Sequence, residues 1–316
     1  MARYNAAMRG LSGEVYEIKF HDFVASVTSV GATLRAFSCG DVPVIWSQPL
    51  EGLPVAGSGQ VLAPWPNRLE NGSYVFDGVT GLAALDEPAR SNAIHGLVRW
   101  LEWKLDYLER SRVKLSCTLA PQPGYPFMLS LAILYEIGPD GLTVRTQAES
   151  GRGTIAPFGI GFHPYFMAAT KGLAGARVAV PATRQLTLDG RGLPVGDREI
   201  DAHLAALSTD EGVALHDLSL DDCFTGLVRD PDGIATLRFF PGDGAISEVT
   251  LRLERPFDYV MCFTGDPLAE SDRRVAVAIE PMTCPPNALS TGIGVTSLHD
   301  GATFEAGFSI RPVLAV

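Results

Sequence analysis

Apolar and polar residues alternate along several stretches of this chain, and this period of two limits its fold more than any other feature. The alternation runs through 113–119, 129–137, 249–253 and 302–310. Successive side chains of a β-strand point to opposite faces, so each stretch is predicted to be a strand with one buried face. Turn residues such as the Gly-Pro-Asp-Gly at 138–141 follow the strands. The strands are therefore expected to pair mainly as antiparallel neighbours.

Helical periodicity is scarce, and only 199–207 is compatible with a short helix. The sequence shows no regular alternation of strands and helices, so it does not indicate a doubly wound sheet. The sequence thus predicts a mainly β fold of large antiparallel sheets packed face to face, with a barrel as the alternative. The 316 residues are 46% hydrophobic, which is enough for a full core. Without a linker-like segment, residues 1–316 are expected to form a single domain.

The formal net charge of −11 opposes partners that are polyanions, namely nucleic acid and anionic membranes. A small neutral ligand fits this charge better. The five cysteines are odd in number and show no zinc-like spacing, which indicates a reducing compartment and no metal site. The opening segment lacks the features of a secretory leader and no stretch is long enough to span a membrane. We therefore expect a cytoplasmic location. The sequence does not distinguish a monomer from a homodimer.

Glu280 is the first candidate for chemistry. It follows an apolar, strand-like run at 275–279 and precedes Pro281, so its carboxylate should emerge where a buried strand ends. Partial burial raises the pKa of a carboxyl group and makes it a stronger base near neutral pH. A glutamate that caps a backbone N–H or pairs with an arginine is the structural alternative.

Two histidines are further candidates. His163 stands between Phe162 and a Pro-Tyr-Phe run, a rigid setting in which an imidazole can deliver a proton. His95 precedes Gly96, which allows a ligand close to the backbone. The alternatives are a packed core histidine for His163 and an exposed turn histidine for His95.

Asn67 and Arg68 follow a stiff Pro-Trp-Pro segment, so their amide and guanidinium have fixed directions suited to neighbouring sugar hydroxyls. Asp221 could accept hydrogen bonds from two vicinal hydroxyls. Alternatively, Arg68 could form a structural ion pair, and Asp221 could lie in a turn where its side chain accepts a hydrogen bond from the nearby backbone. Trp65, Tyr165 and Phe263 could provide an apolar platform for a sugar ring.

Taken together, these segments resemble the aldose 1-epimerase (mutarotase) family over nearly the whole chain. The motifs that carry the resemblance are Pro66-Asn67-Arg68, Gly72, Phe76-Asp77-Gly78, Ile94-His95-Gly96, Trp103, Gly124-Tyr125-Pro126, His163-Pro164-Tyr165-Phe166, Asp221-x-x-Phe224, Glu280-Pro281 and Asn287-Ala288. The resemblance implies a β-supersandwich similar to galactose mutarotase, with the site in a groove on one sheet. It also implies that no cofactor is required.

By this similarity, Glu280 matches the general base and His163 the general acid, while Asn67, Arg68, His95 and Asp221 match positions that bind the sugar. Glu280 would remove the O1 proton while a protonated His163 donates to the ring oxygen, with a sugar ring's width between the two side chains. Met261 and Met282 stand where many mutarotases have glutamine, which puts galactose specificity in doubt.

Two other functions stay open. A carbohydrate-binding or sugar-sensing β-sandwich would use the same groove without turnover. A glycoside hydrolase would use Glu280 and Asp221 as its carboxylate pair.

Overall fold

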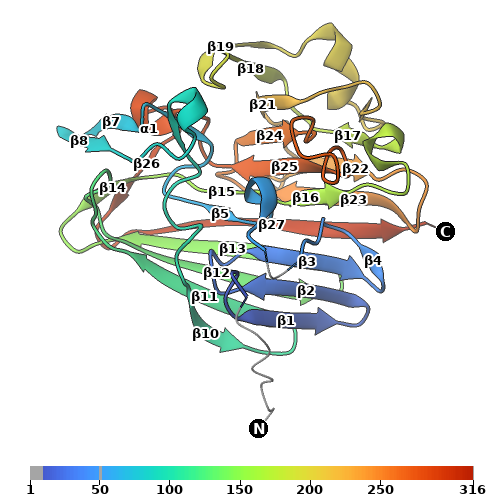
Figure 1. Ribbon diagram of the computed structural model, residues 1–316, viewed down its shortest axis with the longest axis horizontal. Coiled ribbons are helices and arrows are strands. Elements are labelled where there is room, and N and C mark those ends of the chain that lie inside the picture. Colours follow the sequence, from blue (N-terminus) through green and yellow to red (C-terminus); the bar gives the residue numbers. More distant parts are fainter. Residues whose placement is uncertain (1–9, 50–51, 316) are drawn as a thin grey trace.

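The computed structural model describes residues 10–49 and 52–315, and these form a mainly β architecture (Figure 1). Two large sheets dominate it, one of nine strands and one of eight, and every pairing within the sheets is antiparallel. The predicted fold class is therefore confirmed. Residues 1–9, the beginning of the segment read for a leader sequence, lie outside the described part.

The nine-stranded sheet contains all four alternating stretches found in the sequence. Its order is β10-β11-β12-β13-β27-β23-β22-β17-β20. The strands are β10 (Lys104–Leu108), β11 (Arg112–Leu119), β12 (Leu129–Gly138), β13 (Gly141–Ser150), β27 (Thr303–Leu314), β23 (Ile246–Leu253), β22 (Ala235–Phe240), β17 (Arg177–Ala179) and β20 (Val213–Ala214). Gly138 pairs with Gly141, so the Gly-Pro-Asp-Gly run closes the β12–β13 hairpin as expected.

The eight-stranded sheet is built from shorter strands. Its path is β19-β18-β21-β24-β25-β15-β5, and β16 also pairs with β25. The strands are β19 (Pro194–Glu199), β18 (Arg184–Leu188), β21 (Asp221–Thr225), β24 (Tyr259–Phe263), β25 (Ala276–Met282), β15 (Gly161–Phe162), β5 (Val61–Leu62) and β16 (Tyr165–Met167). Strand β25 is central and buried throughout.

Smaller sheets and short helices complete the described residues. A four-stranded sheet contains β1 (Val15–Phe20), β2 (Phe23–Thr28), β3 (Leu34–Cys39) and β4 (Val42–Pro43). Three two-stranded sheets pair β6 (Arg68–Glu70) with β9 (Asn92–Ile94), β7 (Ser73–Phe76) with β8 (Val79–Leu82), and β14 (Ile155–Phe158) with β26 (Thr296–His299). The helices are η1 (Val55–Gly57), η2 (Pro88–Arg90), η3 (Gly172–Gly175), η4 (Ala202–Ser208) and α1 (Ala288–Thr291), where η denotes a 3₁₀ helix.

Aromatic residues join the inner faces of the two large sheets. Phe162 of β15 contacts Phe308 of β27 with ring centroids 4.9 Å apart, and Phe166 of β16 lies 6.1 Å from Phe239 of β22. These rings belong to one buried apolar cluster that extends through both sheets. Burying apolar surface between the sheets stabilises the fold by about 25 cal/mol per Å². The sheets therefore form a sandwich, not the alternative barrel.

The predicted helix at 199–207 is partly wrong. Glu199 ends strand β19, and the helix that follows is the 3₁₀ helix η4, from Ala202 to Ser208. Only Leu204 and Leu207 are buried there. Two buried residues at this spacing give too little apolar surface to extend a helix in either direction.

Two further observations concern the membrane and the cysteines. Among residues 10–49 and 52–315, no helix has the length and apolar character needed to cross a bilayer. All five cysteines are free thiols.

Candidate active site

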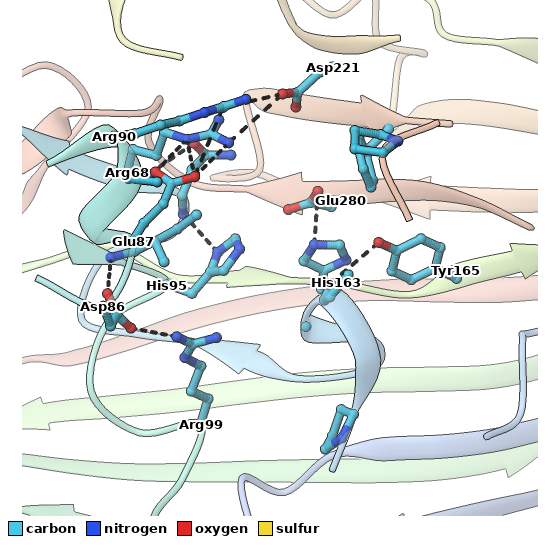
Figure 2. A pocket seen from close by; sticks show the side chains of 18 residues that line it. Arg68, Asp86, Glu87, Arg90, His95, Arg99, His163, Tyr165, Asp221 and Glu280 are labelled. Atoms are coloured by element: carbon cyan, nitrogen blue, oxygen red, sulfur yellow. Dashed lines mark hydrogen bonds and ion pairs between the residues drawn. The ribbon is translucent and has the colours of Figure 1, made fainter. Parts of the chain in front are cut away.

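A cavity of about 440 Å³ opens on the face of the eight-stranded sheet that lies away from the nine-stranded sheet. Along β25, Val277 and Ile279 point into the main core, so the alternation turns Ala278 and Glu280 to the opposite face. Six residues predicted from the sequence line this cavity: Asn67, Arg68, His95, His163, Asp221 and Glu280. Figure 2 labels all of them except Asn67. The structure thus brings all six together.

Strand register explains why His163 meets Glu280. Gly161 pairs with Met282 and Tyr165 pairs with Ala278, so His163 falls opposite Glu280 between the short strands β15 and β16. Pro164 interrupts the ladder there because it has no backbone N–H to donate. The expectation that Glu280 marks the end of a strand is wrong, because β25 continues to Met282.

The two side chains are in direct contact. His163 Nε2 lies 3.3 Å from Glu280 Oε1, and the residues are 5% and 2% exposed. The expected separation of a sugar ring's width is therefore wrong. Each side chain keeps one buried polar atom without a hydrogen-bond partner, His163 Nδ1 and Glu280 Oε2. A buried polar atom is costly to leave unpaired, so a ligand that supplied a hydrogen-bond partner to these two atoms would be favoured.

Burial shifts the pKa values of both Glu280 and His163 toward their neutral forms. It raises the pKa of Glu280 well above the ordinary carboxyl range, with Asp221 adding to the effect and Arg68 opposing it. It lowers the pKa of His163 to about 3, and Arg99 contributes to that fall. Burial therefore favours the arrangement in which Glu280 carries a proton and His163 is neutral. This differs from the expectation that His163 begins protonated and Glu280 ionised.

His95 and Asn67 form a second pair through the backbone. Arg68 of β6 pairs with Ile94 of β9, so the next residues, Asn67 and His95, also face each other. The His95 N–H donates to the Asn67 carbonyl at 2.9 Å, and the Asn67 N–H donates to His95 Nδ1 at 3.3 Å. Burial holds the pKa of His95 well below its usual value. His95 is therefore neutral with its proton on Nε2, the nitrogen left free to donate to a ligand.

Arg68 combines the structural and the functional interpretations. Its guanidinium donates to both oxygens of Glu87, with Nε–Oε2 at 3.0 Å and Nη2–Oε1 at 3.2 Å. The same Nη2 lies 3.8 Å from Asp221 Oδ2. The backbone of Gly192 packs against the other side of the guanidinium. Arg68 is held in one position by these neighbours while it still lines the cavity.

Other charged residues of the cavity were missed from the sequence. Asp86 accepts a hydrogen bond from the Ile94 N–H at 2.7 Å and pairs with Arg99, and Arg90 lies 3.8 Å from Asp221 (Figure 2). The Asp-Glu-Pro-Ala-Arg run at 86–90 was the available signal, since it concentrates charges shortly before His95. With these pairings, each guanidinium of the cavity has a carboxylate partner.

Tyr165 and Phe263 form the apolar part of the wall, with ring centroids 6.5 Å apart. Tyr165 also stacks on His163 at 5.1 Å. Trp65 was expected to join them, but it is 2% exposed and packs in the main core. Met261, directly opposite Glu280, forms a buried apolar cluster with Met282 and two further residues, Leu186 and Cys223. This cluster excludes water from one side of Glu280.

Residues 10–49 and 52–315 contain no group of three or more histidine, cysteine, aspartate or glutamate side chains arranged to hold a metal ion. The rings of His95 and His163 lie edge to face with their centroids 5.3 Å apart.

The chain belongs to the aldose 1-epimerase family, whose family model matches residues 14–311. A curated relative is the uncharacterized protein YihR of Escherichia coli (strain K12), which is 28% identical over 300 residues. That match covers 95% of this chain and 93% of YihR. The resemblance inferred from the motifs is therefore confirmed.

Solved structures share the fold. The GalM/aldose epimerase homologue from C. elegans superposes with a TM-score of 0.84 at 16% identity, covering 96% of this chain and 99% of that one. A galactose mutarotase-like protein from Clostridium acetobutylicum superposes with a TM-score of 0.80 at 15% identity, and the match covers 96% of this chain and 99% of that one. Galactose 1-epimerase from Lactobacillus acidophilus NCFM superposes with a TM-score of 0.75 at 16% identity, and the match covers 100% of this chain and 98% of that one.

Proposed function

We propose that this protein is an aldose 1-epimerase that interconverts the α and β anomers of a free aldose. The observation that carries the proposal is the contact between His163 Nε2 and Glu280 Oε1, 3.3 Å apart at one wall of a polar cavity. In a pyranose, the anomeric hydroxyl O1 and the ring oxygen are bonded to the same carbon. An acid and a base that serve these two oxygens must therefore stand side by side.

Ring opening begins when Glu280 removes the proton from O1 and a protonated His163 donates to the ring oxygen. The C1–O5 bond breaks, its electrons go to O5, and C1=O1 becomes an aldehyde. Rotation about C1–C2 then presents the other face of the aldehyde, and the reverse proton transfers close the ring. The pair carries one proton before and after each step.

The ring-opened state leaves Glu280 protonated and His163 neutral, which is the arrangement that burial favours. Before ring opening, the proton must move from Glu280 to His163. Their direct contact provides a path for that transfer, and polar groups of a bound sugar would lower its cost. Two positioned proton transfers contribute about 10²- to 10⁴-fold each.

Binding is assigned to the rest of the cavity. His95 donates from Nε2, while Asn67, Arg68 and Asp221 provide donors and acceptors for hydroxyl groups. Tyr165 and Phe263 would cover the apolar face of the ring. Because each guanidinium is paired with a carboxylate, a neutral sugar is the favoured ligand.

The proposal is tested by following anomer exchange with one-dimensional NMR across a panel of free aldoses. Glu280→Gln should abolish the catalysed exchange because an amide cannot accept the O1 proton. Glu305→Gln is the matched control, since Glu305 lies on the exposed side of β27, away from the cavity. Full activity in Glu280→Gln would exclude the mechanism.

The same panel separates the two alternatives. A carbohydrate-binding protein would show calorimetric binding of a sugar with no increase in exchange rate. A glycoside hydrolase would release chromophore from aryl glycosides. The direct contact between His163 and Glu280 favours catalysis over binding alone, because a binding protein has no need of a matched acid and base.

A further inference from the structure

The turn between β18 and β19 lies against the wall of the cavity that contains η2. This turn carries Arg191, which does not belong to the described lining of the cavity. Asp189 fixes the shape of the turn, because its carboxylate accepts from the N–H of Arg191 at 2.8 Å and from the N–H of Leu193 at 2.9 Å. The side chain of Arg191 therefore leaves the turn in a defined direction.

The guanidinium of Arg191 joins two further segments to this turn. Its Nε donates to the Arg90 carbonyl at 2.8 Å, and its Nη2 donates to the Ser91 carbonyl at 2.8 Å. Its Nη1 pairs with Glu70 Oε1 at 3.1 Å, and Nη2 also donates to Asn71 Oδ1 at 3.0 Å. The planar guanidinium thus connects the end of η2 with the turn between β6 and β7.

Asn92 continues this connection toward the cavity. It is fully buried, and its Oδ1 accepts from Arg191 Nη2 at 3.2 Å. Its Nδ2 donates to the Arg191 carbonyl at 3.0 Å and to Glu87 Oε2 at 2.8 Å. The same carboxylate of Glu87 accepts from the guanidinium of Arg68 (Figure 2). Arg191 and Arg68 are therefore linked through two intervening side chains.

The residue after Arg191 contacts Arg68 directly. Gly192 has φ +75°, and a Cβ built there would lie 2.8 Å from Arg68 Cζ. A glycine is therefore needed for the turn to pack this closely against the guanidinium. Because Glu87 holds one side of Arg68 and the turn holds the other, a change in the position of the turn would act on Arg68 from both sides.

The helix η2 is short and depends on contacts from outside. It spans Pro88–Arg90, and its N-cap residue Glu87 makes no side-chain cap hydrogen bond. Ser91, directly after the helix, has φ +54°, which is unfavourable for a residue with a Cβ. Arg191 binds the carbonyl groups of Arg90 and Ser91, which a helix end leaves without partners. Arg191 therefore stabilises the segment that carries Glu87.

We propose that Arg191 is a positioning residue of the candidate active site, and that it holds Glu87, and through it Arg68, in the orientation that binds the sugar. The proposal rests on the proposed function, because the ligand of Arg68 is taken to be the sugar. The acid and the base are positioned by β15, β16 and β25 instead. Loss of Arg191 is therefore expected to weaken binding and to leave the proton transfers unchanged.

The first test compares Arg191→Ala with Arg229→Ala. Arg229 is the matched control, because its guanidinium also joins several segments and its side chain is 7% exposed, but it does not belong to the described lining of the cavity. Its acceptors are the carbonyl groups of Gly233, Leu253 and Phe257. Both variants should melt at a lower temperature than the wild type.

Steady-state kinetics then separate the two variants. Arg191→Ala should raise KM about tenfold at nearly constant kcat, which corresponds to the loss of one hydrogen bond to a charged group. Arg229→Ala should keep the KM of the wild type. Arg191→Lys is the second variant if Arg191→Ala folds poorly, since a single ammonium group cannot bridge the same two segments. A KM that is equal in the Arg191 and Arg229 variants would overturn the proposal.

The second test asks whether Arg191 acts through Glu87. KM is measured for Glu87→Gln, for Arg191→Ala and for the double variant. If one residue acts through the other, KM of the double variant should exceed the larger single value by no more than about twofold. Independent effects would multiply to about a hundredfold, and that result would contradict the proposal.

The third test needs no sugar. The Nε–H of Arg68 is bonded to Glu87 and the side chain is 9% exposed, so its NMR resonance should exchange slowly with water in the wild type. This resonance is assigned by its loss in Arg68→Lys. Arg191→Ala should speed the exchange at least about tenfold, whereas Arg229→Ala should not.

Unchanged exchange of this proton in Arg191→Ala would overturn the positioning role. Failure of the proposed function is recognised separately, because no aldose would then exchange its anomers faster than in buffer. The exchange rate of the Arg68 proton would still decide whether Arg191 holds Arg68 in place.

Discussion

Glu280 is a carboxyl group on a central strand, where neither water nor a full set of hydrogen-bond donors solvates its charge. Met261 and Met282 cover one side of the carboxyl group, and the adjacent His163 is buried to a similar extent. Because burial raises the pKa of Glu280, the folded protein binds a proton at this carboxyl group more tightly than the unfolded chain does. The carboxyl group that we propose as the base therefore lowers the stability of the folded protein as pH rises above the pKa of the unfolded carboxyl group.

Glu280→Gln should raise the melting temperature at neutral pH. A raised folded-state pKa contributes stability that is present below the pKa of the unfolded carboxyl group and is lost as pH rises toward the folded-state value. The wild type has thus lost this contribution at pH 7, whereas the neutral amide has not. We expect a gain of about 1–3 kcal/mol near pH 7, since a tenfold change in proton affinity corresponds to about 1.4 kcal/mol. Thermal unfolding measured from pH 4 to pH 8 should show the gain shrinking toward pH 4.

Glu87→Gln should raise KM with little change in kcat. Glu87 accepts from Arg68 Nε and Nη2, so its loss frees the guanidinium to move in the cavity. An interaction that serves binding equally in the ground and transition states affects KM alone, here by about tenfold. Glu109→Gln is the control because Glu109 makes a similar two-bond pair with Arg112 on the exposed surface. A fall in kcat at constant KM would argue against a positioning role for Glu87.

At the scale of elements, the 3₁₀ helix η1 brings the backbone of Gly57 against the imidazole of His163. A Cβ at Gly57 would lie 2.9 Å from His163 Cδ2, and φ there is +76°. Only glycine adopts this conformation and leaves space for the ring. The helix therefore helps to hold His163 beside Glu280.

Gly57→Ala should displace His163 and lower kcat/KM by about 10- to 100-fold, because a shift of about 1 Å in a reacting group costs up to about 10². Gly78→Ala is closely matched, since Gly78 has φ +75° but a Cβ there would meet nothing within 4 Å. Both variants should lose about 1–2 kcal/mol of stability from the left-handed conformation. Steady-state kinetics and thermal unfolding of the two proteins separate the displacement from the backbone strain. Equal kinetics would remove this role from Gly57.

At the scale of the whole molecule, two sheets packed face to face keep the strands of the active site in register. Strand β22 shows the difference between the two faces of a sheet. Phe239 is 1% exposed and contacts Phe166, whereas the next residue, Phe240, lies on the other face under the guanidinium of Arg177.

Phe239→Ala should destabilise the protein by about 3–5 kcal/mol, because it leaves a cavity between the sheets. Phe240→Ala should cost about 1 kcal/mol, since it removes only a partly exposed ring and one cation–π contact. Chemical denaturation of both variants measures the difference. Similar losses would mean that the inner contact contributes less than its burial indicates.

Much of the fold followed from local pattern. The strands β11, β12, β23 and β27 alternate clearly and were predicted, and so was the turn that closes the β12–β13 hairpin. The short strands β5, β15 and β16 were not, because two or three residues carry no period. These short strands are the ones around His163, so the local structure of the site was the least predictable part.

The sequence by itself determined the β architecture, the family and six of the side chains that line the cavity, because alternation, turn chemistry and motif order are properties of the chain alone. Tertiary structure decided that His163 touches Glu280, that His95 is neutral with its proton on Nε2, and that Arg68 is held by Glu87. These features depend on the register between strands far apart in the chain and on the exclusion of water by both sheets. Neither is encoded in any single segment.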